Sequence, residues 1–157
     1  MYKSAKKGWY KIINPDKFIK PKDNYMKSFN ESDGFNVEYK SGLELKAFRF
    51  MDASPSVKKW SLEPFPIQYI KPTDGMIHRY FIDLYAEFNN GSKFIIEIKS
   101  YNETIPPKKP KKLTPKTENN YRRAITTWAI NSAKWKEAKL FARENNMKFI
   151  ILTEKDL

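Results

Sequence analysis

Asp83, Glu97 and Lys99 are the residues of this sequence whose types and spacing most clearly suggest chemistry. Apolar and polar residues alternate over 80–88 and again over 94–99, which is the period of two expected of β-strands. Two carboxylates on neighbouring strands can share one divalent cation, and an amine beside them can act on a water molecule or a phosphate. Metal-dependent cleavage of a phosphodiester bond uses this set of residues.

The register of the hairpin decides whether the two acids meet. A three-residue loop that ends at Gly91, in the left-handed conformation, places Asp83 opposite Glu97. Phe81 and Lys99 are then the next pair along the strands. Opposed residues share one face with Cβ atoms roughly 5 Å apart, whereas a two-residue turn would point the two acids to opposite faces. A purely structural interpretation stays open, because solvated strands often carry such charges.

The composition of the chain restricts the classes of binding partner and cofactor that we expect. The chain of 157 residues fits one domain, and its 30 Lys and Arg against 18 Asp and Glu give a net charge of +12. That charge favours a polyanion, nucleic acid first and an anionic membrane surface second. No apolar run approaches the ~20 residues of a membrane span and no signal sequence is recognisable, so we expect a soluble, intracellular protein.

Cysteine is absent and His78 is the only histidine. Disulfides, thiolate zinc sites, cysteine nucleophiles and paired-histidine metal sites are therefore excluded. An enzyme with this composition depends on carboxylates, lysines and a hard cation that prefers oxygen ligands. His78 itself is more typical of a loop or strand edge than of a catalytic base.

Residues 1–38 are predicted to form a basic, aromatic N-terminal extension, and 39–157 the main domain. Eight lysines in residues 1–32 are interleaved with aromatic rings. Such a segment can be an arm that becomes ordered along a phosphate backbone, or a folded extension whose rings belong to the core. The aromatic content favours the folded interpretation.

The remaining pattern predicts an α/β fold with a mixed sheet flanked by helices. The expected elements are a helix over 43–51, a strand over 57–70 interrupted by prolines, the hairpin, a basic loop over 105–116, a helix over 118–145 and a buried strand over 147–153. A strand, a helix and a strand in succession imply a right-handed crossover.

Several cationic and polar side chains outside the hairpin are candidates for contact with DNA. The predicted DNA-binding residues are Lys58, Lys59, Lys108, Lys109, Lys111, Lys112, Asn131 and Lys134. The loop lysines have an equally good interpretation as a solvated linker. Asn131 and Lys134 either orient a phosphate or support helix packing, and Trp135 is expected in the core.

The order of elements, with Asp83 on one strand and Glu97-Ile-Lys99 on the next, resembles the restriction-endonuclease-like fold of the PD-(D/E)xK nucleases over residues 40–157. Ile82 stands where that motif has proline. Two segments resemble the TnsA-like branch of transposon endonucleases: 39–44, with its Ser-x-x-Glu pattern, and 131–135, with its Asn-x-x-Lys-Trp pattern.

Two further segments, 41–50 and 55–63, resemble the head completion nucleases of T4-like tailed phages. The resemblance implies that Asp83, Glu97, Glu44 and the Ile98 backbone carbonyl hold Mg²⁺, for which Mn²⁺ substitutes. It also implies that Lys99 orients and helps to ionise the attacking water. Glu44 has an alternative interpretation as a surface residue of its helix.

The implied activity is hydrolysis of double-stranded DNA that leaves a 5′-phosphate, used to trim packaged DNA before tails join filled heads. The implied partners are DNA and phage capsid or neck proteins, with no membrane, in the host cytoplasm during assembly or in the virion. One alternative is a DNA-binding neck component that keeps the fold without catalysis. Another is an enzyme of the same fold that acts on DNA junctions or tRNA. Retention of both acids and the lysine favours catalysis.

Overall fold

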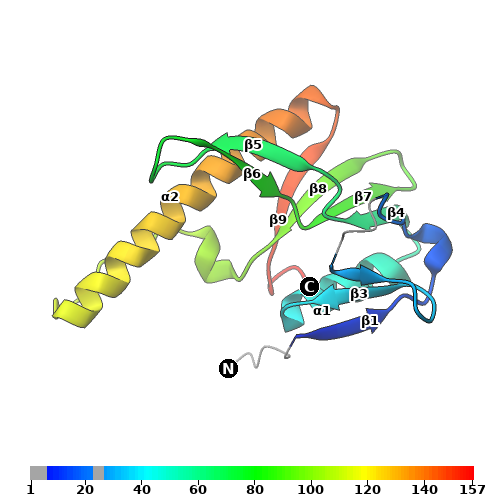
Figure 1. Ribbon diagram of the computed structural model, residues 1–157, viewed down its shortest axis with the longest axis horizontal. Coiled ribbons are helices and arrows are strands. Elements are labelled where there is room, and N and C mark those ends of the chain that lie inside the picture. Colours follow the sequence, from blue (N-terminus) through cyan, green and yellow to red (C-terminus); the bar gives the residue numbers. More distant parts are fainter. Residues whose placement is uncertain (1–6, 23–26) are drawn as a thin grey trace.

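The computed structural model describes residues 7–22 and 27–157 (Figure 1). Its elements in chain order are β1 (Gly8–Lys11), the 3-10 helix η1 (Pro15–Lys17), β2 (Phe29–Asn30), β3 (Asn36–Tyr39), α1 (Gly42–Ala53), β4 (Val57–Leu62), β5 (Pro66–Ile70), β6 (Ile77–Phe81), β7 (Leu84–Phe88), β8 (Lys93–Ile98), the 3-10 helix η2 (Tyr101–Thr104), α2 (Pro115–Glu144) and β9 (Lys148–Leu152).

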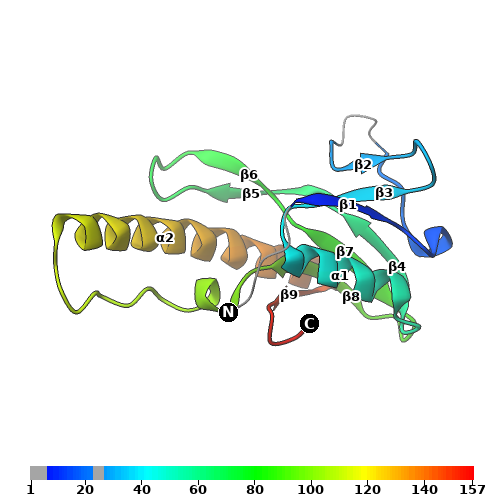
Figure 2. The same cartoon turned by 90° about the horizontal axis from the view of Figure 1, so that it is seen from below.

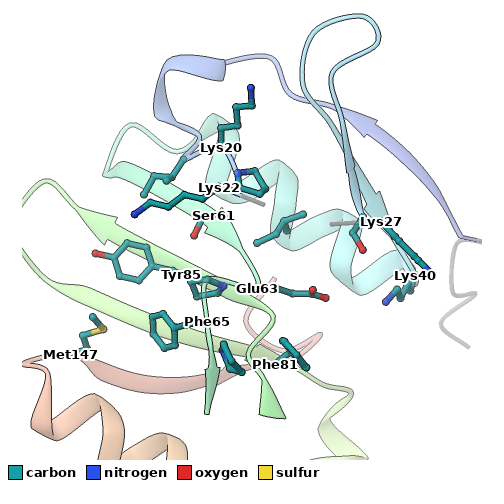
Figure 3. Close-up of a pocket in the computed structure, with 16 residues that line it drawn as sticks. Lys20, Lys22, Lys27, Lys40, Ser61, Glu63, Phe65, Phe81, Tyr85 and Met147 are labelled. Atoms are coloured by element: carbon teal, nitrogen blue, oxygen red, sulfur yellow. The ribbon is translucent and has the colours of Figure 1, made fainter. Parts of the chain in front are cut away.

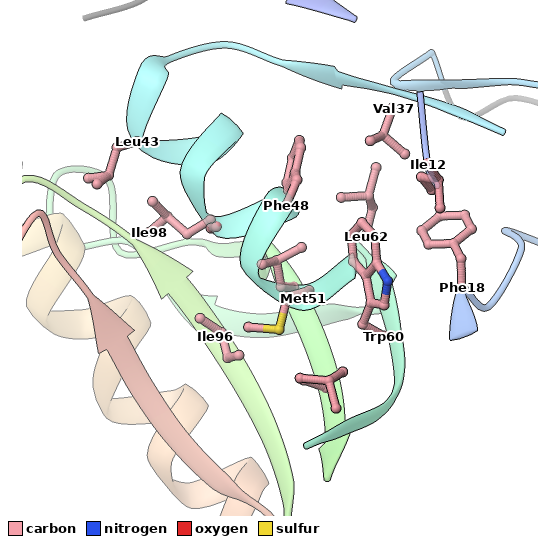
Figure 4. Packing of buried hydrophobic residues seen from close by; sticks show 14 residues of the cluster. Ile12, Phe18, Val37, Leu43, Phe48, Met51, Trp60, Leu62, Ile96 and Ile98 are labelled. Carbon is pink, nitrogen blue, oxygen red and sulfur yellow. The ribbon is translucent and has the colours of Figure 1, made fainter. Parts of the chain in front are cut away.

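The central sheet has the strand order β4-β7-β8-β9. The pairs β4–β7 and β7–β8 are antiparallel, and β8–β9 is parallel across the connection that contains α2. One face packs against α1, through a core that includes Met51, Trp60 and Ile96 (Figure 4). The other face packs against the C-terminal half of α2, where Ile95 and Trp135 are buried. The predicted mixed α/β sheet flanked by helices is confirmed.

Helix α1 begins and ends where the local sequence directs. Ser41 is its N-cap, and its hydroxyl accepts a hydrogen bond of 3.1 Å from the Glu44 amide. Leu43, Ala47 and Met51 recur at helical spacing and are buried. Ser54 caps the C-terminus in an extended conformation, as the residue before Pro55 favours.

The strand predicted over 57–70 is two strands in different sheets. β4 ends at Leu62, Glu63 has a φ of +34° that few non-glycine residues adopt, and Pro64 follows. The chain then turns into β5, which pairs with β6 as a separate two-stranded sheet. β4 is an edge strand with an irregular register between Val57 and Lys59, in line with the predicted effect of the prolines.

The predicted pairing of the hairpin strands is confirmed from the turn to Leu84 and Ile96, and it is wrong for Phe81. Gly91 has a φ of +88°, and the Phe88 amide donates to the Ser92 carbonyl at 2.9 Å. The run 80–88, however, is broken at 82–83 between β6 and β7. Phe81 lies opposite Pro66 in the β5–β6 sheet, so its expected pairing with Lys99 is wrong.

The described part of the N-terminal segment is folded onto the main domain. β1, β3 and β2 form a small antiparallel sheet. Ile12 and Phe18 enter the same core as α1, and the Phe18 ring lies 4.9 Å from that of Trp60, edge to face. Trp9 is exposed, while Lys3, Lys6 and Tyr25 lie outside the described residues. The division between residues 38 and 39 stays a prediction.

Helix α2 starts at Pro115, three residues earlier than predicted, because Thr114 and Thr117 form a capping box and proline is favoured in the first turn. Its N-terminal half extends away from the body of the molecule (Figure 2). β9 is half-buried rather than buried as predicted, since it lies at the edge of the sheet. Among the described residues, no helix is long and apolar enough to cross a membrane.

Candidate active site

The carboxyl groups of Asp83 and Glu97 come together at the end of the β7–β8 hairpin. The pairing of Leu84 with Ile96 is the last of the ladder, and the next opposed positions are Asp83 and Glu97. Asp83 Oδ2 accepts a hydrogen bond of 2.8 Å from the Ile98 amide. Glu97 is only 6% exposed. The residues opposed by the register therefore form an acidic pair, in which Glu97 is buried and Asp83 is half-buried.

Burial and mutual repulsion disturb the titration of this pair. Desolvation, followed by the charge of Glu97, raises the pKa of Asp83 to about 8. Desolvation also raises the pKa of Glu97, and the Tyr80 hydroxyl and Lys99 oppose that shift. Two anions held together away from water favour uptake of either a proton or a cation.

Tyr80 and Lys99 both contact Glu97. The Tyr80 hydroxyl donates a hydrogen bond to Glu97 Oε2, and Lys99 Nζ lies 3.8 Å from Glu97 Oε1. Burial and the carboxylate raise the pKa of Tyr80, which keeps its hydroxyl protonated as a donor. No pattern in the sequence indicates Tyr80 as part of the site, because it reaches Glu97 from β6, which belongs to the second sheet.

Lys134 of α2 lies on the side of the acidic pair where Tyr80 contacts Glu97. Its ammonium is 5.5 Å from the centre of the Tyr80 ring and 5.7 Å from that of Tyr69. Burial lowers the pKa of Lys134, and the charge of Glu97 opposes that shift. Asn131, one turn earlier, is buried, as is Trp135. Lys134, predicted as a DNA contact, therefore belongs to the surroundings of Glu97.

Glu44 approaches the pair from α1. It lines a small recess together with Asp83 and Glu63, and its charge adds to the rise in the pKa of Asp83. Burial raises the pKa of Glu44 itself. Its Oε2 accepts a hydrogen bond of 2.5 Å from the Lys40 amide, which completes the helix cap. Its second carboxylate oxygen, Oε1, is the one left for a shared ion while this hydrogen bond persists.

The donor set fits a hard cation at the Asp83–Glu97 pair itself. Within residues 7–22 and 27–157, no three His, Cys, Asp or Glu side chains converge closely enough to form a complete metal site. Two poorly solvated, mutually repelling carboxylates still supply the anionic oxygens that Mg²⁺ prefers. Coordination of the cation by the Ile98 carbonyl and by Glu44 remains a prediction.

The other predicted DNA contacts do not gather around the acids. Lys59 lies opposite Glu87, toward the far end of the sheet, and its ammonium donates to the Asp16 carbonyl at 3.0 Å. Lys58 lies 3.8 Å from Glu87. The loop lysines, all exposed, lie between η2 and α2; they are Lys108, Lys109, Lys111 and Lys112. Their contact with DNA stays a prediction.

A mixed sheet flanked by helices, with acids and a lysine at one end of its central hairpin, defines the class of restriction-endonuclease-like α/β proteins. Residues 54–154 match the model of the TnsA-like endonuclease N-terminal family, and the chain belongs to that family. The matched range contains Asp83, Glu97 and Lys99, whereas Glu44 precedes it.

The chain is also similar to the head completion nuclease of Enterobacteria phage T4. The two are 37% identical over 125 residues, which cover 80% of this chain and 83% of the phage protein.

Proposed function

We propose that this protein is a divalent-metal-dependent DNA nuclease whose catalytic residues are Asp83, Glu97 and Lys99. The observation that carries the proposal is the poorly solvated acidic pair with Lys99 at 3.8 Å from Glu97. Two carboxylates without a sufficient counter-charge are costly to bury, and a bound cation offsets that cost. Membership of an endonuclease family gives the pair its substrate class.

Each residue of the site has a distinct task. Asp83 and Glu97 hold Mg²⁺, or Mn²⁺ in its place, with Glu44 and the Ile98 carbonyl as further ligands. When bound, the cation neutralises charge on the scissile phosphate and lowers the pKa of water. Tyr80 fixes the orientation of Glu97 through its hydroxyl. Lys99 holds the attacking water by hydrogen bonding and stabilises the negative charge that develops on the phosphate oxygens.

The biological setting follows from the phage relative. A protein named head completion nuclease suggests that this chain acts during phage head completion. We propose double-stranded DNA as substrate and capsid or neck proteins as partners, in the host cytoplasm during assembly. The net charge of +12 suits a polyanionic substrate, because lysines and arginines that neutralise phosphates release counterions.

Nicking of supercoiled plasmid tests the proposal. Cleavage is expected with Mg²⁺ or Mn²⁺ and is expected to stop in EDTA or with Ca²⁺ alone. Asp83→Ala, purified in parallel, controls for a contaminating nuclease. Undiminished cleavage in EDTA would overturn the metal mechanism. Binding of DNA without cleavage under every metal condition would instead favour a structural component of the phage neck.

A further inference from the structure

A groove with a volume of about 790 Å³ opens beside the acidic pair (Figure 3). Its walls come from the N-terminal segment, the β4–β5 junction and strands β6 and β7. Cavities of this size commonly hold small organic ligands. The proposed mechanism uses none of the side chains that form its two main walls.

One wall is strongly basic. Four lysines line it, Lys20, Lys22, Lys27 and Lys40, and Glu63 is the single acid among the described lining residues. Lys20 pairs with Glu31 at 2.7 Å. Lys22 and Lys27 form no ion pair with any residue that the structure describes. This excess positive charge suits a chain of phosphates.

The opposite wall is aromatic. Phe65, Phe81 and Tyr85 line it, and Figure 3 shows their rings along one side of the groove. Phe65 is anchored by the Phe141 ring at 4.8 Å between centroids. Phe81 is 47% exposed, because the break between β6 and β7 removes it from the central sheet. Phe65 and Tyr85 are half-buried, and the Arg79 guanidinium lies 5.6 Å from the centre of the Phe81 ring. Aromatic rings beside lysines, with an arginine available for a cation–π contact, are a feature of proteins that stack unpaired bases.

The groove adjoins the candidate active site. Ser28, Lys40, Leu62 and Glu63 line both the groove and the recess that contains Asp83. The Glu63 amide donates to the Asp83 carbonyl at 2.9 Å. A strand that occupies the groove therefore lies next to the recess that Asp83 lines.

We propose that this groove holds a single-stranded segment of the DNA substrate, with its phosphates on the lysine wall and its bases against the aromatic wall. The inference rests on the proposed function and adds to it a preference for duplex ends that carry or open into single strands. Bases inside a duplex are stacked on their neighbours and present no free face to a ring, whereas the unpaired bases of an overhang can stack on one.

Fluorescence anisotropy with the full-length chain in EDTA tests the groove. The probes are a blunt duplex, the same duplex with a single-stranded overhang, and a short single strand. The overhang duplex is expected to bind at least about 5-fold more tightly than the blunt one, as the stacking of one additional base implies. Phe81→Leu is expected to remove that difference, while Phe50→Leu, with a ring 45% exposed elsewhere, preserves it.

The lysine wall is tested by the salt dependence of single-strand binding. The double variant Lys22→Ser, Lys27→Ser is expected to reduce the slope of log affinity against log salt by ~0.7 for each phosphate that these lysines neutralise in the wild-type chain. Lys136→Ser, Lys139→Ser removes the same charge from the exposed face of α2. Equal effects of the two double variants, or equal affinity of blunt and overhang duplexes, would overturn the proposal.

These measurements do not require cleavage. Repeating them with Asp83→Ala keeps binding readable if the wild-type chain degrades the probes. Loss of plasmid nicking with the overhang preference intact would contradict the nuclease proposal alone. Nicking without any overhang preference would contradict the groove alone.

Discussion

Two aspartates in this molecule, Asp52 and Asp83, have opposite surroundings. Asp52, at the end of α1, is 1% exposed and accepts hydrogen bonds from the Tyr10 hydroxyl at 2.5 Å, the Ile13 amide at 2.8 Å and the Asn14 amide at 2.9 Å. Asp83 accepts one amide hydrogen bond and faces a second carboxylate, that of Glu97.

This difference in hydrogen-bond partners distinguishes Asp52, a structural aspartate, from Asp83, the proposed catalytic one. The donors around Asp52 satisfy its charge and fasten the N-terminal segment to α1, with Lys17 adding a bond of 3.0 Å to the Asp52 carbonyl. The surroundings of Asp83 leave a demand for positive charge that the protein alone does not meet. The residue type is the same, Asp52 is buried and Asp83 is half-buried, and the clearest difference between the two is in their partners.

The largest expected effect is on catalysis. Asp83→Asn and Lys99→Ala are each expected to reduce the rate of plasmid nicking at least about 100-fold, because the first weakens the proposed hold on the cation and the second removes positive charge beside the reacting phosphate. DNA binding is expected to persist, since many other lysines contact phosphates. Lys148→Ala, an exposed lysine at the start of β9, is the control. Near wild-type nicking by either site variant would refute the site assignment.

The second effect is on the pH dependence of stability. Because the pKa of Asp83 is raised to about 8, the folded chain binds more protons than the unfolded chain between pH ~4 and ~8. Stability in EDTA is therefore expected to fall as pH rises through that window. Urea unfolding at several pH values measures it.

Two controls sharpen this measurement. Asp83→Asn is expected to flatten the profile, because it removes the titrating charge. Mg²⁺ is expected to stabilise the wild-type chain more at pH 8 than at pH 5, since protons compete with the cation at low pH. A wild-type profile that matches that of Asp83→Asn would show that the acidic pair carries no repulsion.

Substitution of Asp52 is expected to have the opposite effect, with a loss of stability and little change in nicking. Asp52→Ala is expected to lower the free energy of unfolding by about 3 kcal/mol, because three donors lose their acceptor in a buried place. Nicking per folded molecule is expected to stay near that of the wild type. Asp33→Ala, an exposed acid paired with Lys11, is the control and is expected to change stability little. An equal fall in stability for both variants would remove the distinction between the two aspartates.

The smallest effect concerns the turn that sets the register. Gly91 has a φ of +88° with nothing within 4 Å of an added Cβ, so Gly91→Val strains the backbone without a clash, by about 1–2 kcal/mol. Nicking is expected to fall more than stability does, because the turn aligns Asp83 with Glu97. Gly34→Val introduces similar strain far from the acids. A parallel fall in nicking for both variants would indicate a general loss of stability.

The N-terminal segment shows why its sequence pattern was ambiguous. A run of lysines and rings is consistent with a phosphate-binding arm or with a folded element, and only partners elsewhere in the chain distinguish them. Trp60 receives the Phe18 ring, and Asp52 receives the backbone around Asn14. Deletion of residues 1–32 would therefore remove Ile12 and Phe18 from the core, so it is unsuitable as a test of DNA binding.

Local sequence determined the elements whose signals lie within a few residues. Ser41 defines the start of α1, Gly91 defines the hairpin register, and the register alone brings Asp83 to Glu97. These features depend on capping, a left-handed turn and the period of a strand, all of which are short-range.

The tertiary structure decided how the acidic pair is surrounded. The break at residues 82–83 separates β6 from β7, so Tyr80 reaches Glu97 from a second sheet and Phe81 turns toward the groove. Lys134 arrives from α2, more than thirty residues later. Such contacts depend on how sheets and helices pack over long sequence separations, and no local pattern encodes them.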